Sequence, residues 1–302
     1  MSAVASKAPQ VPEQSARFAE ILKRLIDKSV DGYYNPYREF DWPDSLPEQM
    51  SWMSHDLVST YGTEVAKELT AEEAQRLSRW ESINFYSLNV EGIRELLIEV
   101  IKRIHTTGFE LPSDFFHHFI GEENEHMWFF AEFCLRYGDK IYSGPKLNSI
   151  PHDNAQVENF LVFSRILLFE EIVDFYNMRM AGDDSLHETI RKVNRVHHED
   201  ESRHIAFGRE LVSMLYSEMA GTMTDQQRLE IEQYLKRYIV FSLRSFYNPQ
   251  VYRDARIANP LEFRERVVSD PARRELERKI VRKPMSFMLK SGIFADDLLP
   301  DI

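Results

Sequence analysis

The chain has 302 residues, of which 43% are hydrophobic and 12% aromatic, enough for a substantial core in one large domain. Its formal net charge of −12 argues against a general nucleic-acid-binding or anionic-membrane surface, because phosphate binding depends on clustered Lys and Arg. No run of 18 apolar residues is present, and the N-terminal stretch MSAVASKAPQVPEQSARF lacks the apolar core of a signal peptide. We therefore expect a cytoplasmic protein with no nucleic-acid or membrane partner.

Proline is distributed as in a helical protein. The 13 Pro residues fall mostly between three long proline-free runs, 48–111, 113–144 and 152–248. No convincing strand or hairpin pattern and no repeat of fixed period is present. The sequence therefore predicts an all-α fold.

The predicted elements begin after an N-terminal tail. Residues 1–13 are expected to be disordered, and residues 14–302 to form a single all-helical domain. An amphipathic helix, SARFAEILKRLIDKSVD, comes first. The segment 32–49, rich in aromatic residues and Pro, is predicted to be a loop that covers the body of the protein.

Four long helices follow, and local start signals place each of them. The signals are Thr70 with Glu73, then Ser113, then Asn154, then Ser185 with Glu188. The first helix is expected to stop near Thr106–Gly108 and the second at Gly138. These helices define a predicted core of about residues 70–216.

Further helices are expected after this core. Thr224 with Gln227 forms another capping-box pattern, which opens a helix that runs to about Asn248. Short helices or loops, broken by Pro260, Pro271 and Pro284, complete the chain.

The stretch HHEDESRHIAFG, residues 197–208, contains three histidines and three acidic residues within its first eight positions. Neither Gly nor Pro interrupts positions 183–207, so the stretch is read with a helical period of 3.6 residues. On that period, one stripe holds His197, Glu201, His204 and Gly208, whereas residues 198–200 point elsewhere. The cluster therefore divides into a selective face and a solvated face.

Each of the four long helices carries acidic residues in otherwise apolar surroundings. In chain order the candidates are Glu91 and Glu95, Glu123 and His126 (E-N-E-H), Glu170 and Glu171 (LLFEEIV), and Glu201 and His204 (E-S-R-H). The order Glu, Glu-x-x-His, Glu, Glu-x-x-His is that of ferritin-like di-iron and di-manganese carboxylate bundles. Residues i and i+3 share a helical face, so each Glu-x-x-His directs a carboxylate and an imidazole to one region.

Simpler interpretations exist for each piece. A single Glu-x-x-His is commonly a solvated helix face, a lone Glu in an apolar helix can be salt-bridged, and His197 can pair with Glu201 on the helix surface. The recurrence of the unit 78 residues apart, at 123–126 and 201–204, favours a dimetal site. The one cysteine, Cys134, lies in a packed helical pattern, so any metal must use His and carboxylate, which suit iron or manganese.

The chain resembles the AurF-type di-iron N-oxygenases, the family that includes p-aminobenzoate N-oxygenase. The resemblance rests on the Glu-x-x-His pairs and on the additional histidine in H-x-x-x-E-x-x-H, here HHEDESRH, and it spans roughly residues 80–210. It implies a ferritin-like four-helix bundle core with additional N- and C-terminal helices. It also implies the metal ligands Glu91, Glu123, His126, Glu170, His197, Glu201 and His204.

Two of these positions have close alternatives. Glu95 competes with Glu91, whose interval to Glu123 is about one helical turn shorter than in the family, and Glu171 competes with Glu170. Asp174 and Asp200 are candidates to accept the second ring proton of a ligand histidine, each weighed against an ordinary surface carboxylate.

The substrate is less well defined by the sequence. The turn before Glu91, INFYSLNV, has no Arg or Lys for an aminobenzoate carboxylate, and Arg94 one turn later compensates only in part. Aromatic and Met side chains near the ligand stripes are expected either to line an aryl pocket or, for most of them, to pack the core. They are Phe85, Tyr86, Phe116, Met127, Phe163 and Tyr176.

The resemblance implies an O2-activating enzyme. We expect a di-iron monooxygenase with two iron ions per chain, manganese being an alternative, that oxidises an arylamine or another small amine. It would need an external electron donor, and a homodimer is expected from the resemblance alone. The rival functions are a di-iron hydroxylase or desaturase acting on carbon, a ferritin-like iron storage or ferroxidase protein, and a helical interaction protein without metal.

Overall fold

The computed structural model describes residues 13–144 and 154–300. These residues form helices and connecting segments and contain no strand, so the predicted all-α fold is confirmed. Of the predicted tail, residues 1–12 lie outside the described residues. The extent of the domain, residues 14–302, stays a prediction.

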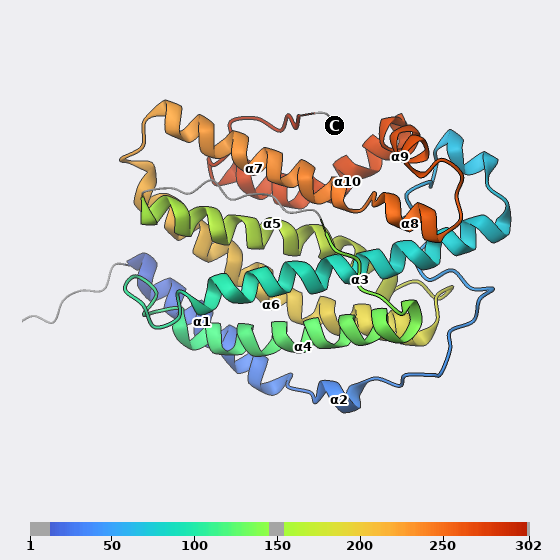
Figure 1. Ribbon diagram of the computed structural model, residues 1–302. Coiled ribbons are helices and arrows are strands. Elements are labelled where there is room, and N and C mark those ends of the chain that lie inside the picture. The colour runs from blue at the N-terminus through green and yellow to red at the C-terminus, as the bar shows by residue number, and fades with distance from the viewer. Residues whose placement is uncertain (1–12, 145–153, 301–302) are drawn as a thin grey trace, which may run out of the picture.

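Four long helices form the centre of the molecule: α3 (Ala71–Ile101), α4 (Ser113–Gly138), α5 (Ala155–Ala181) and α6 (Glu188–Ala220). They run alongside one another along the long axis of the molecule (Figure 1). The most extensive contacts join α5 to α6 and α3 to α4. All of the residues that the sequence nominates as metal ligands lie on these helices.

Local capping residues explain where most of these helices begin. The capping box of Thr70 and Glu73 opens α3, and the Asn154 side chain accepts a hydrogen bond from the Gln156 amide at the start of α5, as the sequence predicts. Two predicted caps are wrong. Pro112 is the N-cap of α4, because the Ser113 hydroxyl donates to the carbonyl of Phe109 instead.

The start of α6 is also different from the prediction. His187 is its N-cap and accepts a hydrogen bond from the Thr189 amide through Nδ1. Ser185 is instead held in the preceding turn, where its amide and hydroxyl both donate to Asp183. Asp183 therefore binds the Ser185 hydroxyl in the turn, and His187 caps α6 in place of Ser185.

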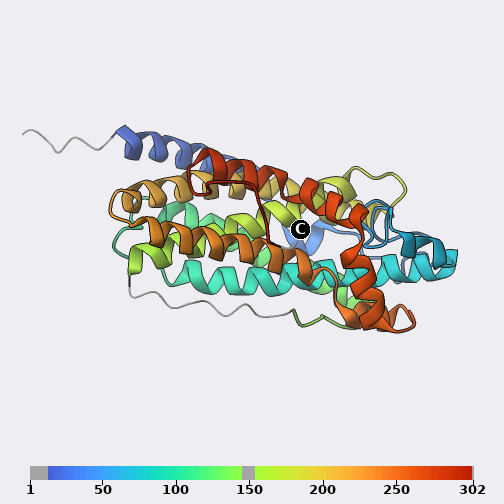
Figure 2. The same ribbon diagram turned by 90° about the horizontal axis from the view of Figure 1, so that it is seen from above.

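The remaining helices surround this centre (Figures 1 and 2). Helix α1 (Glu13–Asp31) packs on α4 and α6, and the predicted loop 32–49 contains the single turn α2 (Pro36–Glu39). A 3-10 helix, η1 (Glu64–Glu68), precedes α3.

The C-terminal helices cover the opposite side, where α7 (Asp225–Ser245) and α10 (Pro271–Lys290) both pack on α5. Two short helices, α8 (Pro249–Asp254) and α9 (Pro260–Ser269), connect α7 to α10. Pro260 and Pro271 each stand at the first position of a helix and so separate it from the preceding segment, as predicted. Pro284, in contrast, is buried inside α10. Its predicted role as a break is therefore wrong.

The register of α3 against its neighbours follows from close side-chain contacts. Phe85 stacks on Tyr176 of α5 with ring centroids 5.4 Å apart, and seven residues later Gly92 lies against Phe169 of the same helix. A Cβ atom at Gly92 would come within 2.5 Å of the Phe169 ring, so glycine permits this approach. Helices α3 and α5 are therefore antiparallel, with residue 91 near the level of residue 170.

The aromatic side chains that the sequence nominates for an aryl pocket are packed against one another. Phe116 and Phe163 stack with centroids 5.7 Å apart, and Phe85 lies between Tyr86 and Tyr176. All of the six candidates except Met127, which is partly buried, belong to the buried core. These side chains therefore pack the core, as the second of the two interpretations expects.

Two further sequence expectations concern the core and the membrane. Cys134 is buried beside Ser87 and the Ile83 carbonyl, and burial raises the pKa of its thiol to about 12. Within residues 13–144 and 154–300, no helix combines the length and apolar character needed to span a bilayer.

Candidate metal centre

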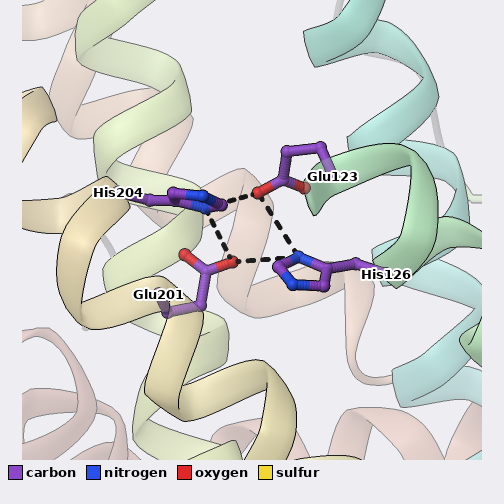
Figure 3. Close-up of side chains that lie close together, drawn as sticks. All are labelled: Glu123, His126, Glu201 and His204. Atoms are coloured by element: carbon purple, nitrogen blue, oxygen red, sulfur yellow. Dashed lines mark ion pairs between the residues drawn. The ribbon is translucent and has the colours of Figure 1, made fainter. Parts of the chain in front are cut away.

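Two central helices bring four of the predicted ligands together. Glu123 and His126 come from α4, Glu201 and His204 come from α6, and the four side chains point toward one another (Figure 3). One potential ligand atom of each lies within 4.8 Å of those of the other three. The i, i+3 spacing of each pair therefore delivers two carboxylates and two imidazoles to one point, as predicted.

The carboxylates alternate with the imidazoles around this cluster. Nδ1 of His204 lies 2.7 Å from Glu123 Oε1 and 3.5 Å from Glu201 Oε1. Nδ1 of His126 lies 3.5 Å and 3.7 Å from the same two oxygens. All four side chains are at most 1% exposed, so bulk water does not solvate these charges.

The outer nitrogen of each ring is held by a carboxylate from the opposite helix. His126 on α4 donates through Nε2 to Asp200 Oδ2 on α6 over 2.9 Å, and His204 on α6 donates through Nε2 to Glu122 Oε2 on α4 over 2.7 Å. Arg203 donates to both of these carboxylates, over 2.6 Å to Asp200 and 2.8 Å to Glu122. The inner nitrogen, Nδ1, is consequently directed into the cluster in both rings.

Asp200 was expected on the solvated face of the helix or as an acceptor from a ligand histidine. Only the second expectation matches its position, because Asp200 is 4% exposed and contacts His126. Asp174 instead accepts a hydrogen bond from Nδ1 of His198, which lies outside the cluster.

Three contributors to this outer layer, Glu122, Arg203 and Tyr34, are not among the residues predicted from the sequence. Glu122 directly precedes Glu123, just as Asp200 directly precedes Glu201, so an acidic residue before each Glu-x-x-His was the available signal. Tyr34, which donates to Asp200 over 3.2 Å, comes from the segment after α1 and had no sequence signal.

His197 extends the cluster by one turn of α6. Its Nε2 lies 3.1 Å from Glu201 Oε1, and its Nδ1 accepts a hydrogen bond from the buried amide of Asn177 on α5 over 2.6 Å. The ring is 1% exposed and packs 4.8 Å from the Phe130 ring. The third imidazole thus lies inside the bundle and not on a helix surface.

The doublet Glu170–Glu171 is divided between two environments. Glu171 accepts two hydrogen bonds from Arg209, over 2.7 and 2.9 Å. Glu170 is 3% exposed, and neither of its carboxylate oxygens has a hydrogen-bond partner among the described residues. Burial, reinforced by the charge of Glu201, raises the pKa of Glu170 well above its usual range.

Glu91 is not brought to the cluster. Its carboxylate forms an ion pair with Arg94 at 2.6 Å, and both side chains are partly exposed, by 23% and 48%. The alternative, Glu95, is exposed as well. Helix α3 therefore directs neither candidate carboxylate inward, and Arg94 lies on the outside with Glu91.

The buried carboxylates give the cluster a strongly negative potential. Burial alone would lower the pKa of His126, but Glu123 and Asp200 outweigh it and raise that pKa to about 10. Burial is likewise outweighed at His204, mainly by Glu201, and the pKa of this ring is raised well above its usual range. A site that holds protons this firmly also attracts divalent cations, which compete for the same nitrogens.

The helical bundle and its buried Glu/His cluster together define the class: an all-α, ferritin-like bundle with side chains that could hold a metal. The sequence model of the family described as p-aminobenzoate N-oxygenase AurF matches residues 15–292, nearly the whole chain. The chain belongs to this oxygenase family. Among curated proteins, no match was found.

Proposed function

We propose that this protein is a non-haem di-iron oxygenase that uses O2 to oxidise the nitrogen of an arylamine or another small amine. The observation that carries the proposal is the buried cluster of Glu123, His126, Glu201 and His204, extended by His197 and Glu170. Membership of an N-oxygenase family supports nitrogen as the atom oxidised.

Hydrogen bonds within the cluster do not satisfy all of its oxygen and nitrogen atoms, whereas coordination of a metal pair would. Three buried carboxylate oxygens, Glu170 Oε1 and Oε2 and Glu201 Oε2, have no hydrogen-bond partner among the described residues. Glu123 Oε1, His126 Nδ1 and His204 Nδ1 contact one another as ion pairs but without good hydrogen-bond geometry. A buried polar group without a partner costs about 1–3 kcal/mol, and a bound metal pair would satisfy all of these atoms together. Carboxylate oxygens and imidazole nitrogens, without thiolate, are donors that iron and manganese accept.

The proposed ligands from this set are Glu123, His126, Glu170, His197, Glu201 and His204. When bound, a ferrous pair supplies the electrons and coordination positions that O2 activation requires. Asp200 and Glu122 hold two of the rings with Nδ1 inward, and Arg203 balances the charge of these two carboxylates. Phe119 packs 4.5 Å from the His204 ring, and such apolar neighbours exclude water.

We propose that the substrate is an amine that need not carry a carboxylate group. Arg94, which could bind such a carboxylate, is paired with Glu91 and half exposed, which does not favour an aminobenzoate held from α3. An external electron donor and a homodimeric state are part of the proposal.

The decisive experiment counts Fe(II) ions bound per chain under anaerobic conditions, with Mn(II) titrated in parallel. We expect two tightly bound Fe(II) ions per chain and, once O2, a reductant and an arylamine are supplied, an oxygenated amine detected by mass spectrometry. Absence of stoichiometric metal binding would overturn the proposal. Metal binding with oxidation only at carbon would support the hydroxylase or desaturase function instead. A large cage in gel filtration would support iron storage.

The contact between Asp200 and His126 supplies a separate prediction. Asp200→Asn is expected to lower Fe(II) affinity by about 10–100-fold, because the imidazole loses both its fixed orientation and the carboxylate that increases its basicity. Anaerobic titration against a competing chelator measures this change. Glu199→Gln, an exposed neighbour on α6, is the matched control and should bind iron as the unaltered protein does.

A further inference from the structure

Helix α3 contributes no carboxylate to the cluster, although the other three central helices each contribute at least one. Glu91 and Glu95 both face outward. Among the buried polar residues of α3, Asn89 lies nearest in sequence to Glu91, the ligand that the resemblance implies. The side chain of Asn89 is buried, and one of its two polar atoms has no partner among the described residues.

The Asn89 side chain is only half satisfied. It is 1% exposed, and its Nδ2 donates to the Phe85 carbonyl one turn earlier over 2.9 Å. Its carbonyl oxygen, Oδ1, has no hydrogen-bond partner among the described residues. An amide oxygen buried without a donor costs about 1–3 kcal/mol, and coordination of a metal ion by Oδ1 would remove that cost.

The direction of Asn89 around α3 points to the interior of the bundle. Successive helical residues are rotated by about 100°, which puts Asn89 roughly 40° beyond Phe85 and roughly 60° short of Tyr86. Phe85 contacts Tyr176 of α5, and Tyr86 contacts Phe130 of α4 with centroids 5.3 Å apart. Asn89 therefore lies between the α4-facing and the α5-facing directions, whereas Glu91 is rotated from it by about 200°, to the outside.

The height of Asn89 along the bundle also matches the cluster. On antiparallel α5, the contacts of Phe85 with Tyr176 and of Gly92 with Phe169 put Asn89 within one turn of Glu170. On α4, the Phe130 that contacts Tyr86 is one turn from His126, and α3 advances toward His126 from Tyr86 to Asn89. The unpartnered oxygens of Asn89 and Glu170 thus occupy one layer of the interior.

We propose that Asn89, and not Glu91, is the α3 donor to the metal pair, with its neutral amide oxygen Oδ1 as the ligand atom. This inference rests on the proposed function and refines its ligand set. The site then holds three carboxylates, those of Glu123, Glu170 and Glu201, where the general pattern of the class has four. It carries one negative charge fewer, and its α3 side differs chemically from the α5 side.

Isosteric and control variants test this assignment by metal binding, without any assay of turnover. Asn89→Leu is expected to lower the affinity for one of the two Fe(II) ions by at least about tenfold, because leucine has a similar volume but no donor atom. Asn89→Asp, which has the same shape and restores a carboxylate, is expected to bind that ion more tightly than the unaltered protein. Glu91→Gln is the matched control on the same helix and should bind both ions unchanged.

Cobalt(II) provides a second probe, because its visible absorption reports the number and type of ligands. The bands should change in Asn89→Leu and Asn89→Asp and stay the same in Glu91→Gln. If Asn89→Leu does not fold, as judged by circular dichroism, the comparison of Asn89→Asp with Glu91→Gln decides.

Two results would overturn the assignment: both Asn89 variants binding iron and cobalt like the unaltered protein, or weakened binding in Glu91→Gln. If the unaltered protein bound no metal, the proposed function itself would fail, which is a distinguishable outcome.

Discussion

Replacing Glu170 by leucine is expected to raise the unfolding free energy of the metal-free protein by about 1–3 kcal/mol and, at the same time, to impair Fe(II) binding. The gain arises because Glu170 is buried with both oxygens unpartnered, and an apolar side chain of similar size removes that cost. The loss of Fe(II) binding arises because α5 then supplies no carboxylate to the cluster. Urea unfolding without metal and anaerobic titration with Fe(II) measure the two effects.

Glu171 is the matched control, and the opposite result is expected there. Glu171→Gln weakens the hydrogen bonds from Arg209, so the metal-free protein should lose about 1–2 kcal/mol, whereas iron binding should be unchanged. If Glu171→Gln lost iron and Glu170→Leu retained it, the ligand on α5 would be Glu171. A simple structural role for Glu170 predicts destabilisation by leucine, which the urea experiment distinguishes.

The second large effect is a dependence of stability on pH that originates away from the metal centre, at Glu81. This carboxyl on α3 is buried, accepts a hydrogen bond from the Ser59 amide over 2.8 Å, and has its other oxygen unpartnered among the described residues. Burial raises its pKa to about 7, although the Ser59 contact and the charge of Arg273 oppose that rise.

Because the folded protein holds this proton up to about pH 7 and the unfolded chain releases it near pH 4.5, folding is favoured at low pH by this group. Its contribution is complete below pH 4.5 and is lost as the pH rises to 7 and beyond. Between pH 5 and 8 we expect the unfolding free energy to fall by about 2–3 kcal/mol more in the unaltered protein than in Glu81→Gln.

Urea unfolding at a series of pH values gives this difference directly. Glu95→Gln, an exposed glutamate on the same helix, serves as the control and should leave the pH profile of the unaltered protein in place. Parallel pH profiles for Glu81→Gln and the unaltered protein would show that Glu81 is ionised in the folded protein throughout this range.

The features that could be predicted from the sequence are those that depend on neighbours within one turn. The capping boxes at Thr70 and Thr224 and the cap at Asn154 join residues two or three positions apart. The Glu-x-x-His pairs and His197 likewise share a face by the helical period alone, and four of these side chains meet within 4.8 Å. The missed caps, at Ser113 and Ser185, failed because a nearby backbone or side-chain group bonded the hydroxyl first.

The inward face of α3 could not be read from hydrophobic periodicity, because that periodicity requires an exposed side. Every residue from Glu81 to Val90 is buried, since neighbours cover α3 around its circumference over this stretch. The sequence analysis accordingly considered only the carboxylates Glu91 and Glu95, and the packing of Phe85 on Tyr176 and of Tyr86 on Phe130 shows that Asn89 has the inward direction.

The sequence by itself determined the all-α fold, the caps at Thr70 and Asn154, and the Glu/His pairs of α4 and α6, because these features depend on local spacing along a helix. Tertiary structure alone decided which carboxylate of the α5 doublet faces the cluster, since Arg209 reaches Glu171 from a different helix. It also brought Glu122 and Asp200 to the outer side of the histidines and left Glu91 outside with Arg94. These contacts join residues far apart in the chain, and no local pattern encodes them.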